Sequence, residues 1–237
     1  SAALTDVPAS SAQRWRAWIV DGTRVAAEAD ARPAVDTSTA PAAEARAVAR
    51  LTLPASVRRL GADDGVQLVF VADVRCPHCR KTARDIERLS REFGDDLQVA
   101  VILRPNESLY LGADAAAATV QSVSEAQFFA ALARAFRLAH GSTFDVGVFQ
   151  RRLARALPGL DSVALAGAAA SPEVLQALGE QRAWADENGV DGTPLLFIDG
   201  EAIRGAPTFR VLKARINRAM AARAASTRHD AHAPTDQ

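Results

Sequence analysis

Two continuous apolar runs with a helical pattern between them organise the first half of the chain. Residues Gln67 to Ala72 and Leu97 to Leu103 are apolar at nearly every position, as expected for central strands covered on both faces. From Pro77 onward the pattern becomes helical, and it ends at Gly94, a residue type favoured just after a helix. The buried stripe of this helix is predicted to be Ala83, Ile86, Leu89 and Phe93. Strand, helix and strand at this spacing predict two parallel strands joined by a right-handed crossover.

The second half of the chain is first helical and then returns to strands. From Glu107 to Asn188, Ala-rich segments carry aromatic and aliphatic residues at helical spacing, interrupted by glycines and prolines. Strands are predicted at Leu195 to Ile198 and Ala202 to Arg204, joined by a tight turn at Asp199–Gly200. Pro207 opens a last amphipathic helix. The order of elements therefore predicts an α/β fold with a block of helices inserted between its two halves.

The two ends of the chain are less regular. Residues 1–50 form an N-terminal extension rich in Ala, Thr, Ser and Pro, and residues 31–43 within it are predicted to be a linker. An apolar stripe at three- and four-residue steps predicts one helix there, through Trp15, Trp18, Ile19, Gly22, Val25 and Ala26. This helix either packs back on its own domain or serves as an oligomerisation arm. The polar residues 224–237 are predicted to be a disordered tail.

Charge and overall apolarity exclude two classes of partner. Lysine plus arginine (28) equals aspartate plus glutamate (28), so nothing favours a nucleic-acid or anionic-membrane surface. No apolar stretch approaches the roughly 20 residues that a membrane helix needs. The sequence begins at Ser1 without a basic and then apolar leader, which fits either a mature form after removal of an export signal or a trimmed chain.

The candidate chemistry lies in Cys76 and Cys79, the only two cysteines. Two cysteines supply neither a disulfide framework nor a four-sulfur zinc site, so the pair is redox-active or incidental. Unpaired N–H groups and the dipole at the start of a helix lower a cysteine pKa from about 8.5 into the range of roughly 3.5 to 7.5. Cys76 is therefore the predicted nucleophile. Cys79, one helical turn later, is placed to attack a mixed disulfide on Cys76, and this exchange uses no cofactor and no metal.

Charged and polar neighbours of the cysteines have alternative interpretations. His78 either adds a hydrogen-bond donor near the Cys76 sulfur or merely solvates the loop. Arg75 and Arg80 flank the cysteine pair and either hold the thiolate by charge or are solvated. The sequence alone leaves these alternatives open.

Two segments carry a resemblance to a known family. They are CPHC, at the predicted strand–helix junction, and GVDGTPLLFIDGEAIRGAPTF, from Gly189 to Phe209. Together they resemble the DsbA-like branch of the thioredoxin superfamily, which includes thiol:disulfide oxidoreductases of the bacterial cell envelope. The resemblance covers about Leu51 to Ala222. It implies a thioredoxin-like core of residues 51–105 and 189–223, with an inserted helical domain at 106–188.

The resemblance also implies a set of site residues. The catalytic motif would be Cys76, Pro77, His78 and Cys79. Thr193–Pro194 would be the family's cis-proline loop opposite the cysteines, where the exposed backbone of Thr193 would pair with a substrate strand. Asp73, three residues before Cys76, either relays a proton to Cys79 or ends the strand through turn hydrogen bonds.

The leading functional hypothesis is a periplasmic enzyme that oxidises thiols of protein substrates and is itself reoxidised by a membrane partner, such as a quinone-linked oxidase. The close alternative is a disulfide isomerase or reductase that a DsbD-type membrane reductase keeps reduced. A copper carrier using both cysteines, and a scaffold with an inactive pair, are further alternatives. Substrates, redox partner, reduction potential and oligomeric state stay open, including a homo-oligomer formed through the N-terminal extension.

Overall fold

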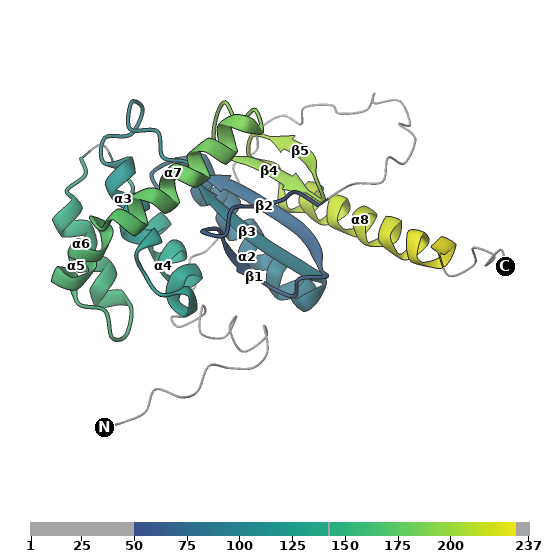
Figure 1. Ribbon diagram of the computed structural model, residues 1–237, viewed down its shortest axis with the longest axis horizontal. Helices are drawn as coiled ribbons and strands as arrows, with labels where there is room; N and C mark the ends of the chain where they lie inside the picture. Colours follow the sequence, from purple (N-terminus) through teal and green to yellow (C-terminus); the bar gives the residue numbers. More distant parts are fainter. Residues whose placement is uncertain (1–49, 142, 231–237) are drawn as a thin grey trace, which may run out of the picture.

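A five-stranded sheet forms the centre of the molecule. The computed structural model describes residues 50–141 and 143–230. The strands run in the order β1-β3-β2-β4-β5, and only the β2–β3 pair is parallel (Figure 1). Their bounds are Arg58–Leu60 (β1), Val66–Ala72 (β2), Leu97–Leu103 (β3), Leu195–Ile198 (β4) and Glu201–Arg204 (β5). The two central strands, β2 and β3, coincide with the two apolar runs, and both are buried along their full length.

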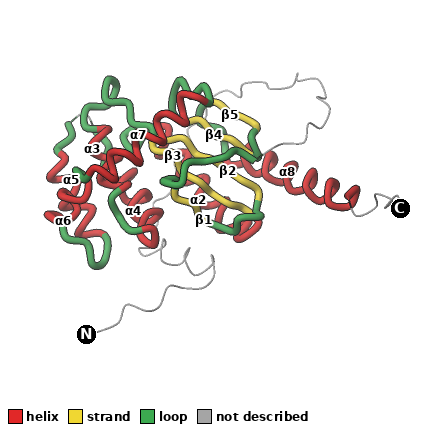
Figure 2. The backbone as a smooth tube through the Cα atoms, in the orientation of Figure 1, coloured by secondary structure: helices red, strands yellow, loops and turns green. Residues whose placement is uncertain are grey.

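Helices cover both faces of the sheet and extend beyond one side of it. Their bounds are Pro77–Phe93 (α2), Gly94–Asp96 (η1, a 3-10 turn), Ala113–Gln121 (α3), Glu125–Leu138 (α4), Val146–Ala156 (α5), Ser162–Ala169 (α6), Pro172–Glu187 (α7) and Phe209–Asp230 (α8). Helices α3 to α6 gather at one side of the sheet, whereas α8 projects from the opposite side (Figures 1 and 2). The fold is therefore thioredoxin-like with a helical insertion between β3 and β4, as predicted.

Alternation along the strands produces two apolar cores. On one face of β2, Leu68 and Phe70 join a large cluster with residues of α2, α4 and α8. On the other face, Val69 and Val71 join a smaller cluster that includes Trp184 of α7. Helix α7 thus belongs only in part to the inserted block, because its C-terminal end also covers the second face of the sheet.

The hairpin predicted at Asp199–Gly200 joins β4 to β5. Both turn residues have positive φ, 44° and 85°, as a two-residue hairpin turn requires. The Asp199 carboxylate accepts the backbone N–H of Gln67 at 2.9 Å. It also accepts the Arg223 guanidinium, with 2.6 Å from Nε to Oδ2. This ion pair ties α8 to the hairpin.

Two sequence-based expectations differ from the structure. The strand β1 was not expected, because three residues with the sequence RRL are too short to show a hydrophobic period. The predicted disordered tail is wrong for residues 224–230, where α8 continues to Asp230. The polar character of that stretch suggested a tail, but it contains neither Gly nor Pro and its alanines favour helix. Residues 231–237 lie outside the described residues.

The predicted N-terminal helix and linker also lie outside the described residues, which start at Arg50. Over the ranges that the structure does describe, no helix has both the length and the apolarity needed to cross a membrane.

Candidate active site

Cys76 lies at the junction where β2 gives way to α2. The chain turns after β2 through a hydrogen bond from the Cys76 N–H to the Asp73 carbonyl at 3.1 Å. Helix α2 then begins at Pro77, which has no N–H to leave unpaired, so Cys76 is the N-cap residue. A side chain at the N-cap faces the first free N–H groups of the helix. The Cys76 side chain makes no capping hydrogen bond of its own, but the backbone N–H groups of Cys79 and His78 favour its thiolate.

The environment of Cys76 stabilises its thiolate. Its pKa is lowered to about 5, first by a hydrogen bond from the Cys79 side chain and then by the backbone N–H of Cys79, the Thr193 side chain and the His78 N–H, while burial opposes the shift. In the thiol form, the Cys76 S–H donates to the Thr193 carbonyl at 3.6 Å. The nucleophile predicted from the motif therefore has the electrostatic setting that the helix start implies.

Cys79 has the opposite character. Burial and the neighbouring Cys76 sulfur raise its pKa well above that of an ordinary thiol. Both cysteines are buried, with exposed fractions of 0% for Cys79 and 2% for Cys76, so they differ in their hydrogen-bond partners and in their pKa. The two sulfurs are thus one stabilised anion and one buried thiol that donates to it, which is the division of roles needed for attack followed by resolution.

The segment before β4 faces the cysteines, although it lies far from them in the sequence. The peptide bond between Thr193 and Pro194 is cis. Thr193 interacts with the Cys76 sulfur through its carbonyl and through its side chain. The Pro194 carbonyl accepts the Gly205 N–H at 3.1 Å, which joins this segment to the end of β5. The structure therefore brings together Cys76, Cys79, Thr193 and Pro194.

Asp73 lies beneath the cysteine loop and is 1% exposed. Its Oδ1 accepts the Arg75 N–H at 2.7 Å, and its Oδ2 accepts the Asn106 N–H at 2.8 Å. These are the turn hydrogen bonds that one interpretation of the sequence expected. Burial nevertheless raises the Asp73 pKa to about 6, against the effect of those N–H groups. A carboxyl group that titrates near neutrality beside the sulfurs is also a candidate proton acceptor.

Arg75 joins the cysteine loop to the helical insertion. Its guanidinium is buried and donates to three carbonyls, those of Leu111, Ala139 and Gly141. It also lies 4.5 Å from the ring centroid of Phe144. Neither sequence-based interpretation, a charge beside the thiolate or a solvated side chain, describes this arginine. Arg80, in contrast, is half-buried and lines a cavity between α2 and α4.

Tyr110 is a site residue that the sequence analysis missed. The segment that carries it is tied to the catalytic loop through Asn106, whose carbonyl accepts the Tyr110 N–H at 2.9 Å. Burial, the Cys76 charge and an interaction of the phenol with the Cys76 sulfur raise the Tyr110 pKa to about 12. Tyr110 is the only tyrosine in the chain. No local pattern links it to Cys76, so its rarity was the only signal available.

The remaining motif residues, Pro77 and His78, are exposed. The contribution of His78 to the Cys76 thiolate comes from its backbone N–H. That the His78 imidazole also lowers the pKa of the Cys76 sulfur stays a prediction. Among the described residues, no group of three His, Cys, Asp or Glu side chains converges in a way that would hold a metal ion.

Comparison with known proteins supports the same assignment of the fold. A family model described as "Thioredoxin" matches residues 58–229. BdbD from Bacillus subtilis, in its oxidised form, shares 18% identity over 72% of this chain and 97% of its own, with a TM-score of 0.62. A periplasmic thioredoxin-like protein from Salmonella enterica serovar Typhimurium shares 20% identity over 70% and 91%, with a TM-score of 0.58.

Proteus mirabilis ScsC in a transitional conformation shares 19% identity over 71% of this chain and 74% of its own, with a TM-score of 0.58. At these identities the likenesses establish the fold. A search of curated proteins found no match.

Proposed function

The chain belongs to the thioredoxin family, and we propose that it is a thiol:disulfide oxidoreductase that oxidises cysteine pairs in protein substrates. The observation that carries the proposal is the asymmetry of its two sulfurs. Cys76 is the N-cap of α2 with a pKa of about 5, and Cys79 is a buried thiol whose pKa is raised. Attack at one sulfur and resolution by a second require this difference.

The reaction starts with Cys76 and Cys79 joined as a disulfide. A substrate thiolate attacks the Cys76 sulfur, a mixed disulfide forms, and Cys79 leaves and takes up a proton. A second substrate thiolate then attacks the substrate sulfur of the mixed disulfide and expels Cys76 as a thiolate. The substrate gains a disulfide and loses two electrons, which the enzyme holds as its reduced pair.

The low pKa of Cys76 gives this exchange a direction. A stabilised thiolate lowers the free energy of the reduced enzyme, so the oxidised pair becomes a stronger oxidant. Cys76 is also the better leaving group, because a thiol with a lower pKa leaves faster. Both effects favour oxidation of substrates over reduction.

The substrate would bind beside the Thr193–Pro194 segment. Thr193 is half-buried next to the Cys76 sulfur, and a substrate strand pairing with its backbone would bring a cysteine to that sulfur. We place the reaction in the bacterial periplasm, with a quinone-linked membrane oxidase as the partner that removes the two electrons. The likeness to a protein described as periplasmic supports this location.

Equilibration with glutathione tests the proposal. The full chain is incubated in defined ratios of reduced to oxidised glutathione, and the reduced fraction is measured after acid quenching and thiol alkylation. We expect a potential clearly more oxidising than the about −270 mV of thioredoxin. A potential at or below that of thioredoxin would reverse the proposed direction and favour a reductase.

Two serine variants test the roles of the sulfurs. Cys76→Ser should abolish exchange with a reduced dithiol peptide. Cys79→Ser, given a disulfide such as oxidised glutathione, should instead accumulate a mixed disulfide at Cys76 and release one glutathione thiol, because the resolving thiol is absent. If Cys79 is alkylated before Cys76 at low pH, the assignment of the roles is reversed.

Refolding of a substrate with scrambled disulfides distinguishes an isomerase from the proposed oxidase. An oxidase with this asymmetry should form disulfides quickly in a reduced substrate but rescue a scrambled one poorly. Efficient rescue by the reduced enzyme would favour the isomerase. The copper-carrier alternative gains no support from the described residues, where no third metal-binding side chain joins the cysteines.

A further inference from the structure

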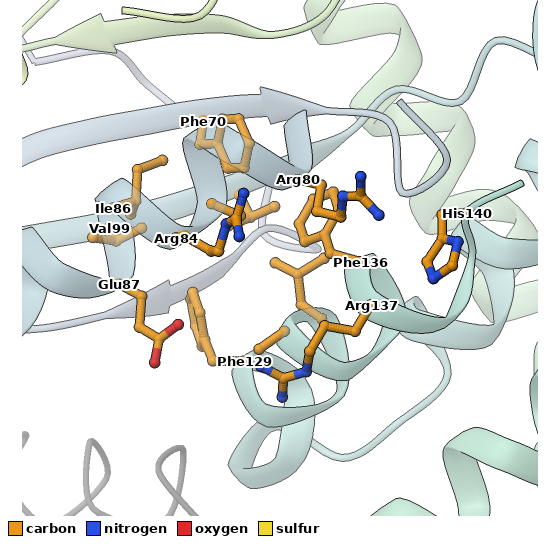
Figure 3. A pocket seen from close by; sticks show the side chains of 14 residues that line it. Phe70, Arg80, Arg84, Ile86, Glu87, Val99, Phe129, Phe136, Arg137 and His140 are labelled. Carbon is orange, nitrogen blue, oxygen red and sulfur yellow. The ribbon is translucent and has the colours of Figure 1, made fainter. Parts of the chain in front are cut away.

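A cavity of about 550 Å³ lies between α2, α4 and one face of the sheet (Figure 3). Neither cysteine lines it. Its floor is apolar and buried, formed by Phe70, Val99, Val101, Leu132 and Phe136. The volume falls within the range of about 300–1,000 Å³ typical of sites that bind another molecule. An apolar floor of this size favours an occupant that is apolar on the side facing it.

The entrance to the cavity is positively charged. Arg80, Arg84 and Arg137 border it, and none of them forms a salt bridge within the part of the chain that the structure describes (Figure 3). The single carboxylate in the lining, Glu87, is itself 3.6 Å from Arg91. Partial burial and then the neighbouring Arg134 lower the Arg137 pKa, against a smaller opposing effect of Glu87. The occupant should therefore be apolar on one face and negatively charged beside it.

The N-terminal extension contains a segment with this chemistry. Its predicted helix has an apolar stripe with two tryptophans, Trp15 and Trp18. Residues 15–30 carry three carboxylates, Asp21, Glu28 and Asp30, all C-terminal to the tryptophans, against two arginines, Arg16 and Arg24. We propose that residues 15–30 dock in this cavity as a helix, with the tryptophans on its floor and the carboxylates toward its arginines.

The connecting chain is long enough for this docking. Arg50 is anchored at the sheet, because its guanidinium donates to the Gly65 carbonyl at 2.6 Å and to the Gln98 side chain at 2.7 Å. Gln98 directly precedes Val99, which lines the cavity. The 19 residues from 31 to 49 reach up to about 65 Å when extended. A tethered segment is present at an effective concentration in the millimolar range, which favours it over a free ligand.

A second hollow fits this segment less well. It has a volume of about 810 Å³ and lies between residues 51–55 and α7. Glu180 and Glu187 line it, so the carboxylates of residues 21–30 would meet charges of their own sign. The sign of the lining charges therefore selects the cavity between α2 and α4.

Amide hydrogen exchange of the full chain tests the docking. Ala133→Trp fills the cavity from α4, and Ala126→Trp adds the same side chain at an exposed position of that helix. In the unmodified chain and in Ala126→Trp, we expect amide exchange in residues 15–26 to be at least tenfold slower than in an unprotected chain. In Ala133→Trp, the same residues should exchange at the unprotected rate. Unprotected residues 15–26 in the unmodified chain, or protection that survives Ala133→Trp, would overturn the proposal.

A charge variant gives a second test that leaves the core intact. Arg84 and Arg137 are exposed, so Arg84→Gln with Arg137→Gln should fold normally yet speed exchange in residues 15–26 severalfold. Lys81→Gln removes an exposed charge of α2 outside the cavity and should have no effect. Equal exchange in the two variants would contradict the electrostatic argument. Protection that rises with protein concentration together with the dimer fraction would assign the cavity to a second copy and overturn docking within one chain.

Discussion

At the scale of single residues, the site works through differences between chemically identical groups. Cys76 and Cys79 are both buried thiols, but the Cys79 thiol and the N–H groups at the start of α2 lower the pKa of Cys76, whereas burial raises the pKa of Cys79. Asp73 differs from an ordinary aspartate because its carboxyl group is buried and still accepts two N–H groups. The pKa of each group depends on its surroundings in the fold, so single substitutions of neighbouring residues can test each cause.

Tyr110→Phe should weaken the Cys76 thiolate without removing the aromatic ring. The neutral phenol can donate to the Cys76 thiolate, so its loss should raise the Cys76 pKa by about one unit, which corresponds to about 1.4 kcal/mol. The ultraviolet absorbance of the thiolate, followed against pH, measures the shift. Leu109→Ala, at an exposed position of the same loop, should leave the pKa unchanged. An unshifted Tyr110→Phe titration would make the tyrosine a packing residue only.

Asp73→Asn separates the two roles of this carboxylate. If Asp73 accepts a proton from Cys79, the variant should resolve mixed disulfides about 100-fold more slowly, the lower end of the usual contribution of a general base. The dependence of that step on pH near 6 should also disappear. Asp85→Asn is the control, since burial likewise raises its pKa but it lies among the charged side chains of α2. If Asp73→Asn resolves mixed disulfides at the wild-type rate, the only role left for Asp73 is to form the turn hydrogen bonds.

At the scale of elements, the cysteine loop is held between the sheet, α2 and the helical insertion. Helix α2 presents its free N–H groups to Cys76, while Arg75 binds carbonyls near the start of α3 and at the end of α4. The insertion therefore contacts the cysteine loop through main-chain carbonyls and also through the side chains of Tyr110 and Phe144. Because Arg75 directly precedes Cys76 and binds the end of α4, the position of α4 helps to fix the position of the Cys76 sulfur.

Arg75→Met should loosen this junction. It removes a buried guanidinium and leaves three carbonyls without their donor, so we expect a loss of about 2–4 kcal/mol in the free energy of unfolding. Chemical denaturation of the reduced protein measures it. Arg80→Met, at the arginine on the other side of the cysteine pair, should cost little, because no hydrogen bond from its side chain is formed within the described residues. Similar losses in both variants would show that only side-chain packing matters.

At the scale of the whole molecule, ionisation of the site should couple to stability. The folded reduced protein lowers the Cys76 pKa from 9.0 to about 5. A lowered pKa stabilises the folded state above the pKa of the unfolded thiol, and this contribution is lost as pH falls toward the folded pKa. Asp73 has the opposite sign: its raised pKa of about 6 favours folding at low pH, and that contribution is lost as pH rises through 6.

The reduced protein should therefore lose stability relative to Cys76→Ser between about pH 9 and pH 5. Urea unfolding of both proteins under reducing conditions across this range measures the difference. The variant retains Asp73 but removes the Cys76 charge that helps to raise the Asp73 pKa, so the comparison reports the thiolate together with its effect on Asp73. A constant difference between the two proteins would show that the thiolate is not stabilised by the fold.

The sequence alone determined the parts of this protein that local patterns encode. The apolar runs of β2 and β3, the helix start at Pro77 and the Asp199–Gly200 turn all follow from neighbouring residues, and they place Cys76 at the start of a helix. Only the tertiary structure decided what surrounds that sulfur. The Tyr110 phenol, the Arg75 contacts and the position of Thr193 depend on segments far apart in the chain, and the Asp73 pKa depends on burial. Packing of distant elements creates these relationships, so no short stretch of sequence carries them.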